Sequence, residues 1–202
     1  MRKHESPSPQ PEEKRPTFWA ELYDWLETFA GVIALTVILF TFFFMVIGVD
    51  GSSMYPTLHN SDLLIVRRIG YTPKQGDIVI LRKDTLTDQA IVKRIIATEG
   101  QSVEIDYETN TVYVDEVALS EDYLNFANEN TIEDYGDDYM VERPGMVYSS
   151  FVVPEHSIFV MGDNRNGSTD SRYAELGMVD EDYIIGGAEA LFFPFDRRKL
   201  LN

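Results

Sequence analysis

The strongest feature of the hydropathy pattern is an apolar run near the N-terminus. No charged residue occurs between Glu27 and Asp50, and residues 29–49 form a run of 21 almost entirely apolar positions. As a helix rising about 1.5 Å per residue, this run would measure about 31 Å, the thickness of a bilayer hydrocarbon core. A helix that is apolar on every face for this length is typical of a membrane span rather than of a buried helix in a soluble domain.

A cleavable signal peptide is the other interpretation of this run. Its apolar region is usually shorter, and here 28 residues precede it. Apolar and aromatic residues also recur at helical spacing just before the run, at Phe18, Leu22, Trp25 and Phe29. We therefore predict that residues 17–49 form an interfacial lead-in and an uncleaved transmembrane anchor helix. The polar, Pro-rich residues 1–16 are predicted to be a disordered tail.

Basic residues near the two ends of the anchor indicate its orientation. Four Lys or Arg residues precede it, whereas the first cations on the far side, Arg67 and Arg68, lie 18 residues beyond Val49. Because Lys and Arg near the ends of a span favour the cytoplasmic side, this distribution favours a cytoplasmic N-terminus. The anchor would then be a single pass through the cell membrane, with the remaining chain outside the cytoplasm.

Beyond about Asp62 the pattern changes to short runs of β-branched and aromatic residues separated by turn residues. These runs cover residues 62–69, 76–83, 90–97, 102–107, 111–119, 146–153, 157–162 and 183–193. The fourth and fifth are close enough to form a hairpin over residues 108–110. We predict a mainly β domain over residues 50–202, made of antiparallel sheets packed on each other. The acidic, Tyr-bearing residues 128–142 are predicted to be a surface loop or insertion.

Composition excludes several classes of function. The chain has 17 Lys or Arg and 34 Asp or Glu residues, a net charge of −17, of which residues 50–202 contribute −15. Binding to nucleic acid needs cations that displace counterions from phosphates, so no nucleic-acid partner is expected. The absence of Cys excludes disulfide scaffolds, thiol nucleophiles and thiolate metal sites.

The chain contains a candidate hydroxyl nucleophile and several candidate bases. Residues 51–58 (GSSMYPTL) follow the anchor closely, but a Ser nucleophile needs a neighbouring base. His4 lies in the predicted tail, and His59 and His156 have no evident catalytic setting. Lys93 lies in an apolar, β-branched run, where burial would disfavour the ammonium form and lower the pKa of its amine. A plain linker at 51–58 and an outward-pointing Lys on an edge strand remain the simpler alternatives.

A third segment, residues 161–173, places small, polar and charged residues directly after an apolar strand. Such a segment suits a functional loop held at a strand end, and a salt-bridged structural loop is the competing interpretation. It partly resembles a calcium loop, but Gly162 stands where the leading carboxylate would be required. We therefore expect no metal site.

Together the three segments resemble the bacterial type I signal peptidases, which are membrane-anchored Ser/Lys endopeptidases. The resemblance covers about residues 25–195. Its motifs are Ser53-Met54-Tyr55-Pro56 just after the span, Lys93-Arg94 in a strand, and Gly162-Asp163-Asn164-Arg165 followed by Ser168, Asp170 and Arg172.

This resemblance implies a role for individual residues. Ser53 matches the family nucleophile and Lys93 its general base. Ser168 matches a hydroxyl that orients the Lys amine, and Asp170 and Arg172 match supporting residues that form an ion pair.

Other motif positions carry less information. Tyr55 and Pro56 belong to the turn of the nucleophile, and Arg94 has a motif position without a role that we can derive. Well-known family members carry an oxyanion-stabilising Ser two positions before the nucleophile, where this chain has Gly51. The backbone N–H of Ser53 is then the donor that the resemblance leaves for the oxyanion.

The resemblance further implies the activity. Such an enzyme cleaves N-terminal signal peptides from secreted preproteins at the outer face of the cytoplasmic membrane, through an acyl-enzyme and without a cofactor. Its substrates carry small residues at positions −1 and −3, and their attachment to the same bilayer raises their effective concentration. Because the Lys must be neutral, an alkaline optimum is expected. A related Ser/His signal peptidase and an inactive membrane-anchored binding or scaffold protein on the same fold are the alternatives.

Overall fold

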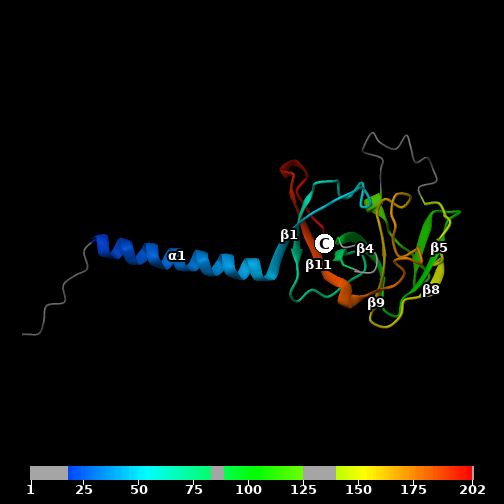
Figure 1. Ribbon diagram of the computed structural model, residues 1–202, viewed down its shortest axis with the longest axis horizontal. Helices are drawn as coiled ribbons and strands as arrows, with labels where there is room; N and C mark the ends of the chain where they lie inside the picture. The colour runs from blue at the N-terminus through cyan, green and yellow to red at the C-terminus, as the bar shows by residue number, and fades with distance from the viewer. Residues whose placement is uncertain (1–17, 83–88, 125–139, 202) are drawn as a thin grey trace, which may run out of the picture. The chain divides into compact units, whose positions relative to one another are not determined.

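The computed structural model describes residues 18–82, 89–124 and 140–201 (Figure 1). The predicted tail, residues 1–16, and most of the acidic segment 128–142 lie outside the described residues. The chain divides into two compact units, residues 1–41 and 42–202, which are described separately below.

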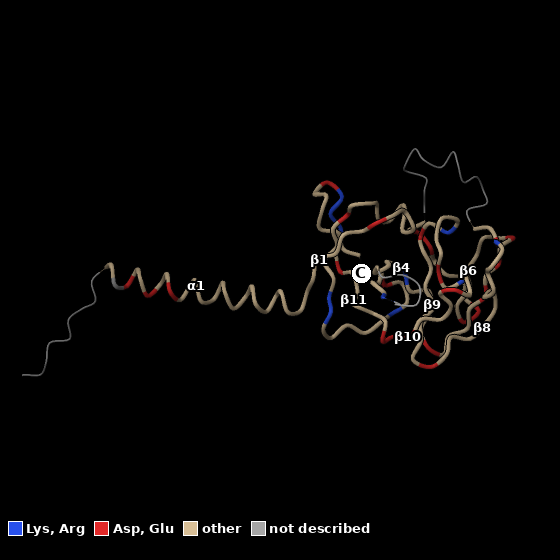
Figure 2. Tube along the Cα trace, viewed as in Figure 1, with Lys and Arg blue, Asp and Glu red and all other residues tan. Residues whose placement is uncertain are grey.

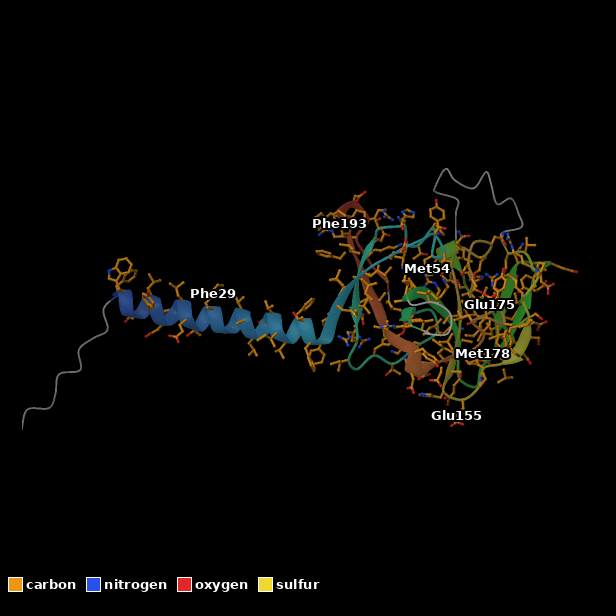
Figure 3. All side chains as sticks on the ribbon, viewed as in Figure 1. Phe29, Met54, Glu155, Glu175, Met178 and Phe193 are labelled. Atoms are coloured by element: carbon orange, nitrogen blue, oxygen red, sulfur yellow. The ribbon has the colours of Figure 1, made fainter. Side chains whose placement is uncertain are left out.

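Helix α1 (Phe18–Phe43) contains the predicted apolar segment. Residues 21–43 of this helix have a mean hydropathy of 2.1, none of the most apolar window is buried, and the helix is long and apolar enough to cross a membrane. Its acidic residues lie near its N-terminal end (Figure 2), and its apolar side chains, such as Phe29 in Figure 3, are exposed. The predicted apolar N-terminal helix is therefore confirmed, and its lead-in is continuous with it.

The helix is shorter at its C-terminal end than we predicted. It ends at Phe43, and strand β1 (Phe44–Gly48) follows, although the apolar run predicted that these residues belong to the anchor helix. β1 pairs with β2 (Leu63–Arg67) in a register that runs from Phe44↔Arg67 to Gly48↔Leu63. Hydropathy could not show this boundary, because a short apolar strand and the end of an apolar helix have similar composition.

The second unit contains an eight-stranded sheet and a four-stranded sheet. Besides β1 and β2, the larger sheet consists of β3 (Ile78–Leu81), β4 (Ile91–Thr98), β9 (Ser157–Met161), β10 (Val179–Asp180), β11 (Ile184–Phe193) and β12 (Lys199–Leu200). The smaller sheet consists of β5 (Ser102–Asp106), β6 (Thr111–Val114), β7 (Val117–Ala118) and β8 (Ser150–Val152). The described residues also form short 3-10 helices, η1 (Asp122–Leu124), η4 (Glu181–Tyr183) and η5 (Phe195–Arg197).

All the strand pairs are antiparallel, which confirms the predicted mainly β fold. The order in the larger sheet is β1-β2-β11-β3-β4-β9-β10, with β12 paired to β11, and the order in the smaller sheet is β7-β6-β5-β8. Every predicted β run overlaps at least one of these strands, and β5 and β6 form the predicted hairpin. The prediction missed β1, β10 and β12. The last two contain only two residues each, which is too short for an alternating pattern.

Alternation along the strands explains how the two sheets pack. In β5, Val103 and Ile105 are buried whereas Glu104 between them is exposed, as expected when successive side chains point to opposite faces. Val103 and Ile105 belong to the same apolar cluster as Phe159 and Met161 of β9. The apolar core between the two sheets therefore packs against β9. The C-terminal end of β9 leads into the loop that follows residue 161.

Candidate active site

Ser53 lies in a tightly packed turn that connects β1 to β2. Met54 is only 1% exposed, and it packs with Leu58 in the apolar core of the larger sheet (Figure 3). Backbone hydrogen bonds from Tyr55 N to Ser52 O (3.1 Å) and from Leu58 N to Met54 O (2.9 Å) close the turn. The segment is therefore not a plain linker, because its buried side chains hold Ser53 at the surface of the β-rich unit.

Lys93 lies on β4, an interior strand between β3 and β9. It is 4% exposed, which excludes the alternative of an outward-pointing Lys on an edge strand. Its Nζ atom is 2.9 Å from Ser53 Oγ. Two residues that are 40 positions apart in the sequence are thus within hydrogen-bond distance.

The surroundings of Lys93 favour its neutral form. Burial lowers the pKa of the Lys93 amine below its usual 10.5, and the charge of Arg172 lowers it further, while Asp170 and Asp163 oppose the shift. A neutral amine has a lone pair that can accept a proton from a neighbouring hydroxyl. The pair can therefore work as a nucleophile and its base.

The loop after β9 approaches the Ser53 turn through its backbone. Asn164 N donates to Ser53 O at 3.0 Å, and Asn164 Nδ2 donates to Ser52 O at 3.1 Å. A Cβ atom on Gly162 would lie 2.3 Å from Ser168 Oγ and 2.4 Å from Ser53 O. Only Gly is accommodated there, and its missing side chain allows Ser53 and Ser168 to come close together.

Ser168 is buried in the site, but its hydrogen bonding differs from the expectation. Within the described parts of the chain its hydroxyl has no hydrogen-bond partner, so the structure does not show the bond to the Lys93 amine. A buried hydroxyl beside the Ser53 turn remains available to an amine or to a bound substrate.

Asp170 and Arg172 form the expected ion pair. Arg172 Nε lies 2.8 Å from Asp170 Oδ1, Arg172 Nη2 lies 2.9 Å from Asp170 Oδ2, and both side chains are 0% exposed. Asp170 Oδ2 also accepts from Gly162 N at 2.9 Å. This bidentate pair connects the end of the loop to its start and fixes Gly162 beside Ser53.

Arg94, for which the sequence suggested no role, anchors the first part of the same loop. It binds Asp163 with two bonds of 2.8 Å and donates to Gly76 O at 2.7 Å. Its guanidinium also lies 3.8 Å from the centre of the Tyr123 ring. Since Arg94 follows Lys93 on β4, the Arg94–Asp163 pair fixes the loop to the strand that carries Lys93.

Arg165 is held by a partner that the sequence analysis missed. It forms an ion pair with Glu121 and a hydrogen bond of 3.2 Å to the Tyr123 hydroxyl. Glu121 is one acid among 34 and lies 44 positions away, so no spacing rule could have identified it. The interpretation of residues 161–173 as a salt-bridged loop is therefore confirmed, and the same loop also contacts the Ser53 turn.

The backbone N–H of Ser53 is a candidate donor for an oxyanion. The N–H of Ser53 has no hydrogen-bond partner among the residues that the structure describes. Gly51 is exposed with a φ of 94°, a conformation that favours Gly, and its N–H donates to Asn60 Oδ1 at 2.9 Å. Gly51 thus helps to shape the turn through its backbone, and it offers no side-chain donor to an oxyanion.

His156 is placed too far away to act as the base. It lies just before β9, whereas Gly162, beside Ser53, follows β9, and the intervening residues span about 20 Å. A hydrogen bond to Asp182 and the charges of Asp180 and Glu181 raise the pKa of its ring. With Asp180 and Asp182 it forms the one group, among the described residues, whose ligand atoms lie close enough to share a cation.

His59 is nearer in sequence, and its ring stacks on Tyr55 with centroids 5.0 Å apart. Of the described side chains, Lys93 is the one that bonds Ser53 Oγ. The geometry therefore favours Lys93 over either His as the base.

A comparison with known protein families agrees with this arrangement. The model of the family described as signal peptidase, peptidase S26, matches residues 22–193, which cover the helix, the Ser53 turn, β4 and the loop after β9. This chain belongs to the signal peptidase family S26. Members of this family are serine endopeptidases, and the chain is accordingly a hydrolase of this class.

Individual relatives in the signal peptidase family align over most of their length. Signal peptidase I S of Bacillus subtilis is 34% identical over 184 residues, covering 90% of this chain and 94% of that protein. Signal peptidase IB of Staphylococcus aureus is 33% identical over 184 residues, covering 89% and 93%. The crystal structure of a signal peptidase I from Enterococcus faecalis is 32% identical, with a TM-score of 0.44, and covers 58% of this chain and 97% of that one.

Proposed function

We propose that this protein cleaves signal peptides from preproteins with Ser53 as nucleophile and Lys93 as general base. The observation that supports this most directly is the 2.9 Å distance between Lys93 Nζ and Ser53 Oγ, in a setting where burial lowers the pKa of the amine. Membership of the signal peptidase family supplies the substrate class, preproteins that carry an N-terminal signal peptide.

In the proposed reaction, the neutral Lys93 amine takes the proton of Ser53 as Oγ attacks the scissile carbonyl. The unpartnered N–H of Ser53 donates to the oxyanion, and the Lys93 ammonium then protonates the leaving amine. The acyl group stays on Ser53 until water, activated by the neutral amine, releases the signal peptide. Ser168 is proposed to orient Lys93 when substrate is bound, and the Asp170–Arg172 pair to hold the loop.

We further propose that α1 spans the cell membrane, with the N-terminus in the cytoplasm and residues 50–202 outside. The length and hydropathy of α1 support the span, and the distribution of Lys and Arg supports the orientation. Ser53 lies ten residues after the end of α1, so the nucleophile is kept near the bilayer that also holds the substrate. Small substrate residues at positions −1 and −3 are part of the same proposal, as is the absence of a nucleic-acid partner.

The test is cleavage of a preprotein by detergent-solubilised full-length protein and by Ser53→Ala and Lys93→Ala variants. We expect a loss of about 10⁴-fold in either variant, because the two groups act as one unit. Mass spectrometry of acid-quenched reactions should show the signal peptide attached to Ser53. Cleavage by Lys93→Ala at the wild-type rate would reject the dyad, and an inactive wild type would favour the scaffold alternative.

A further inference from the structure

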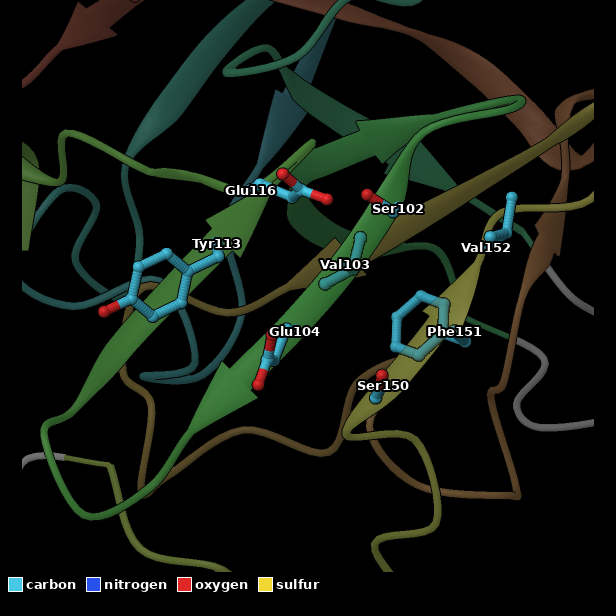
Figure 4. Close-up of a pocket in the computed structure, with 8 residues that line it drawn as sticks. All are labelled: Ser102, Val103, Glu104, Tyr113, Glu116, Ser150, Phe151 and Val152. Atoms are coloured by element: carbon cyan, nitrogen blue, oxygen red, sulfur yellow. The ribbon is translucent and has the colours of Figure 1, made fainter.

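The outer face of the smaller sheet carries a groove that the proposed active site does not use. Its volume is about 320 Å³, and strands β5, β6 and β8 contribute to its wall (Figure 4). Glu104 lies on the central strand, with Tyr113 opposite it on β6 and Ser150 opposite it on β8. The floor thus combines an acidic group with an aromatic ring and a small polar residue.

The groove is acidic and lacks a compensating cation. Glu104 and Glu116 line it, and none of its lining residues is Lys, Arg or His. Asp115 lies next to Glu116 in the β6–β7 turn, where hydrogen bonds from Gln101 and Ser102 lower the pKa of its carboxyl. The groove therefore presents a local negative charge that complements a Lys or Arg side chain.

One side of the groove is an open sheet edge. β8 pairs with β5 alone among the described strands. Val153 forms backbone hydrogen bonds with Gly100 and Gln101, and Ser149 O accepts from Ile105 N. The backbone polar groups of every second residue in 149–153 therefore point toward β5 and the residues next to it. By the same alternation, the N–H and C=O groups of Ser150 and Val152 point away from it. Val152 is 61% exposed, so an extended chain can add here as a further strand.

From these observations we infer that the groove binds an extended, Lys- or Arg-bearing segment of the preprotein, on the mature side of the cleavage site. This inference rests on the proposed function. The signal-peptide side of a bound preprotein stays with the bilayer, so the mature side is the part that is free to cross the β-rich unit. Its backbone would pair with Ser150 and Val152, and its cation would reach Glu104 and Glu116.

The distance sets the length of substrate that is needed. Lys93 and Thr98 lie at opposite parts of β4, about 17 Å apart, and Gly100 N bonds Val153 O just beyond Thr98. The Val152 end of the groove is therefore displaced from Lys93 by about 17 Å along β4, a span that five to six extended residues cover. A cation six to eight residues after the cleavage site would reach the groove, whereas a substrate ending before that point would not.

The test uses three peptides with one cleavage site and full-length protein in detergent. One peptide carries Lys at the sixth to eighth positions after the cut, one carries Glu there, and one ends after the third. We expect kcat/KM for the Lys peptide to exceed that for the Glu peptide about fivefold at low salt, and the ratio to fall as salt is added. A double Glu104→Lys, Glu116→Lys variant should reverse the order, whereas Glu155→Lys, an exposed acid outside the groove, should not.

A second measurement separates binding from catalysis. In a Ser53→Ala background, fluorescence anisotropy of the labelled Lys peptide should show a dissociation constant about fivefold higher after the double substitution. Equal Lys-to-Glu ratios in the wild type and in the double variant would overturn the inference. Cleavage of the short peptide tests the proposed function alone, because that peptide cannot reach the groove.

Discussion

Around β4 and β9 the larger sheet buries six charged side chains, Lys93, Arg94, Asp163, Arg165, Asp170 and Arg172. The smaller sheet buries only apolar side chains, such as Val103, Ile105 and Val112, and exposes its acids, such as Glu104. Burying a charge is costly unless it is paired, and ion pairs hold five of these six side chains: Arg94 with Asp163, Asp170 with Arg172, and Arg165 with Glu121. Lys93 lacks a carboxylate within ion-pair distance in the described residues, and the proposed reaction requires such an unpaired amine.

The two regions should therefore respond differently to substitution. In the larger sheet a change of one atom should lower activity or leave a buried charge unpaired, whereas in the smaller sheet the stability of the fold should depend only on the loss of buried volume. Four experiments test this contrast, beginning with the largest expected effect.

Lys93→Met removes the amine but retains an unbranched side chain of similar length. We expect preprotein cleavage to fall about 10⁴-fold, which corresponds to about 5.5 kcal/mol, since no other base contacts Ser53 in the described chain. Initial rates at saturating preprotein measure the effect, and an intact far-UV circular dichroism spectrum serves as control. Retained cleavage would show that the buried amine of Lys93 is not needed for the reaction.

Asp170→Asn breaks the buried pair with Arg172 without changing the volume. We expect a loss of about 3–5 kcal/mol in the free energy of unfolding, because the Arg172 guanidinium is left buried without its counter-charge. Urea denaturation with an unchanged m-value measures it. Glu104→Gln is the matched control on the smaller sheet, where a change within about 0.5 kcal/mol is expected because Glu104 is exposed. Equal effects of the two substitutions would refute the contrast.

Ile105→Ala tests the apolar side of the comparison. Ile105 is buried between the two sheets, and its truncation should cost about 2–4 kcal/mol in unfolding free energy through lost contacts and a residual cavity. Cleavage of a short peptide at a temperature where the variant remains folded should be unchanged within about twofold. A large loss of kcat without unfolding would show that the two sheets are coupled more tightly than their packing indicates.

The smallest effect concerns the pH dependence of stability. The pKa of Lys93 is lower in the folded state than in the unfolded state. Between the folded-state pKa and 10.5 the unfolded chain therefore binds more protons than the folded chain, so the stability of the fold rises with pH over this range. Lys93→Met should therefore stabilise the protein at neutral pH, and this gain should vanish above pH 10.5. Thermal unfolding from pH 7 to 11 measures it; a gain that grows with pH would contradict the assignment.

Much of the architecture could be predicted because it depends on local patterns. The apolar helix, the order of the β runs and the β5–β6 hairpin follow from hydropathy and turn residues, which act over a few positions. The end of α1 at Phe43 could not be predicted in this way. The residues of β1 become a strand only because β2 is present to pair with them.

The sequence by itself determined which chemical groups this protein has: hydroxyls, one Lys in an apolar strand and a charged loop, without any thiol. Only the tertiary structure decided which of these groups meet, because Ser53, Lys93 and Asn164 come from three separate elements. It also decided that Arg94 and Arg165 hold the loop through Asp163 and Glu121. The physical reason is that a pKa depends on burial and a contact on backbone pairing, and both arise from residues far apart in the chain.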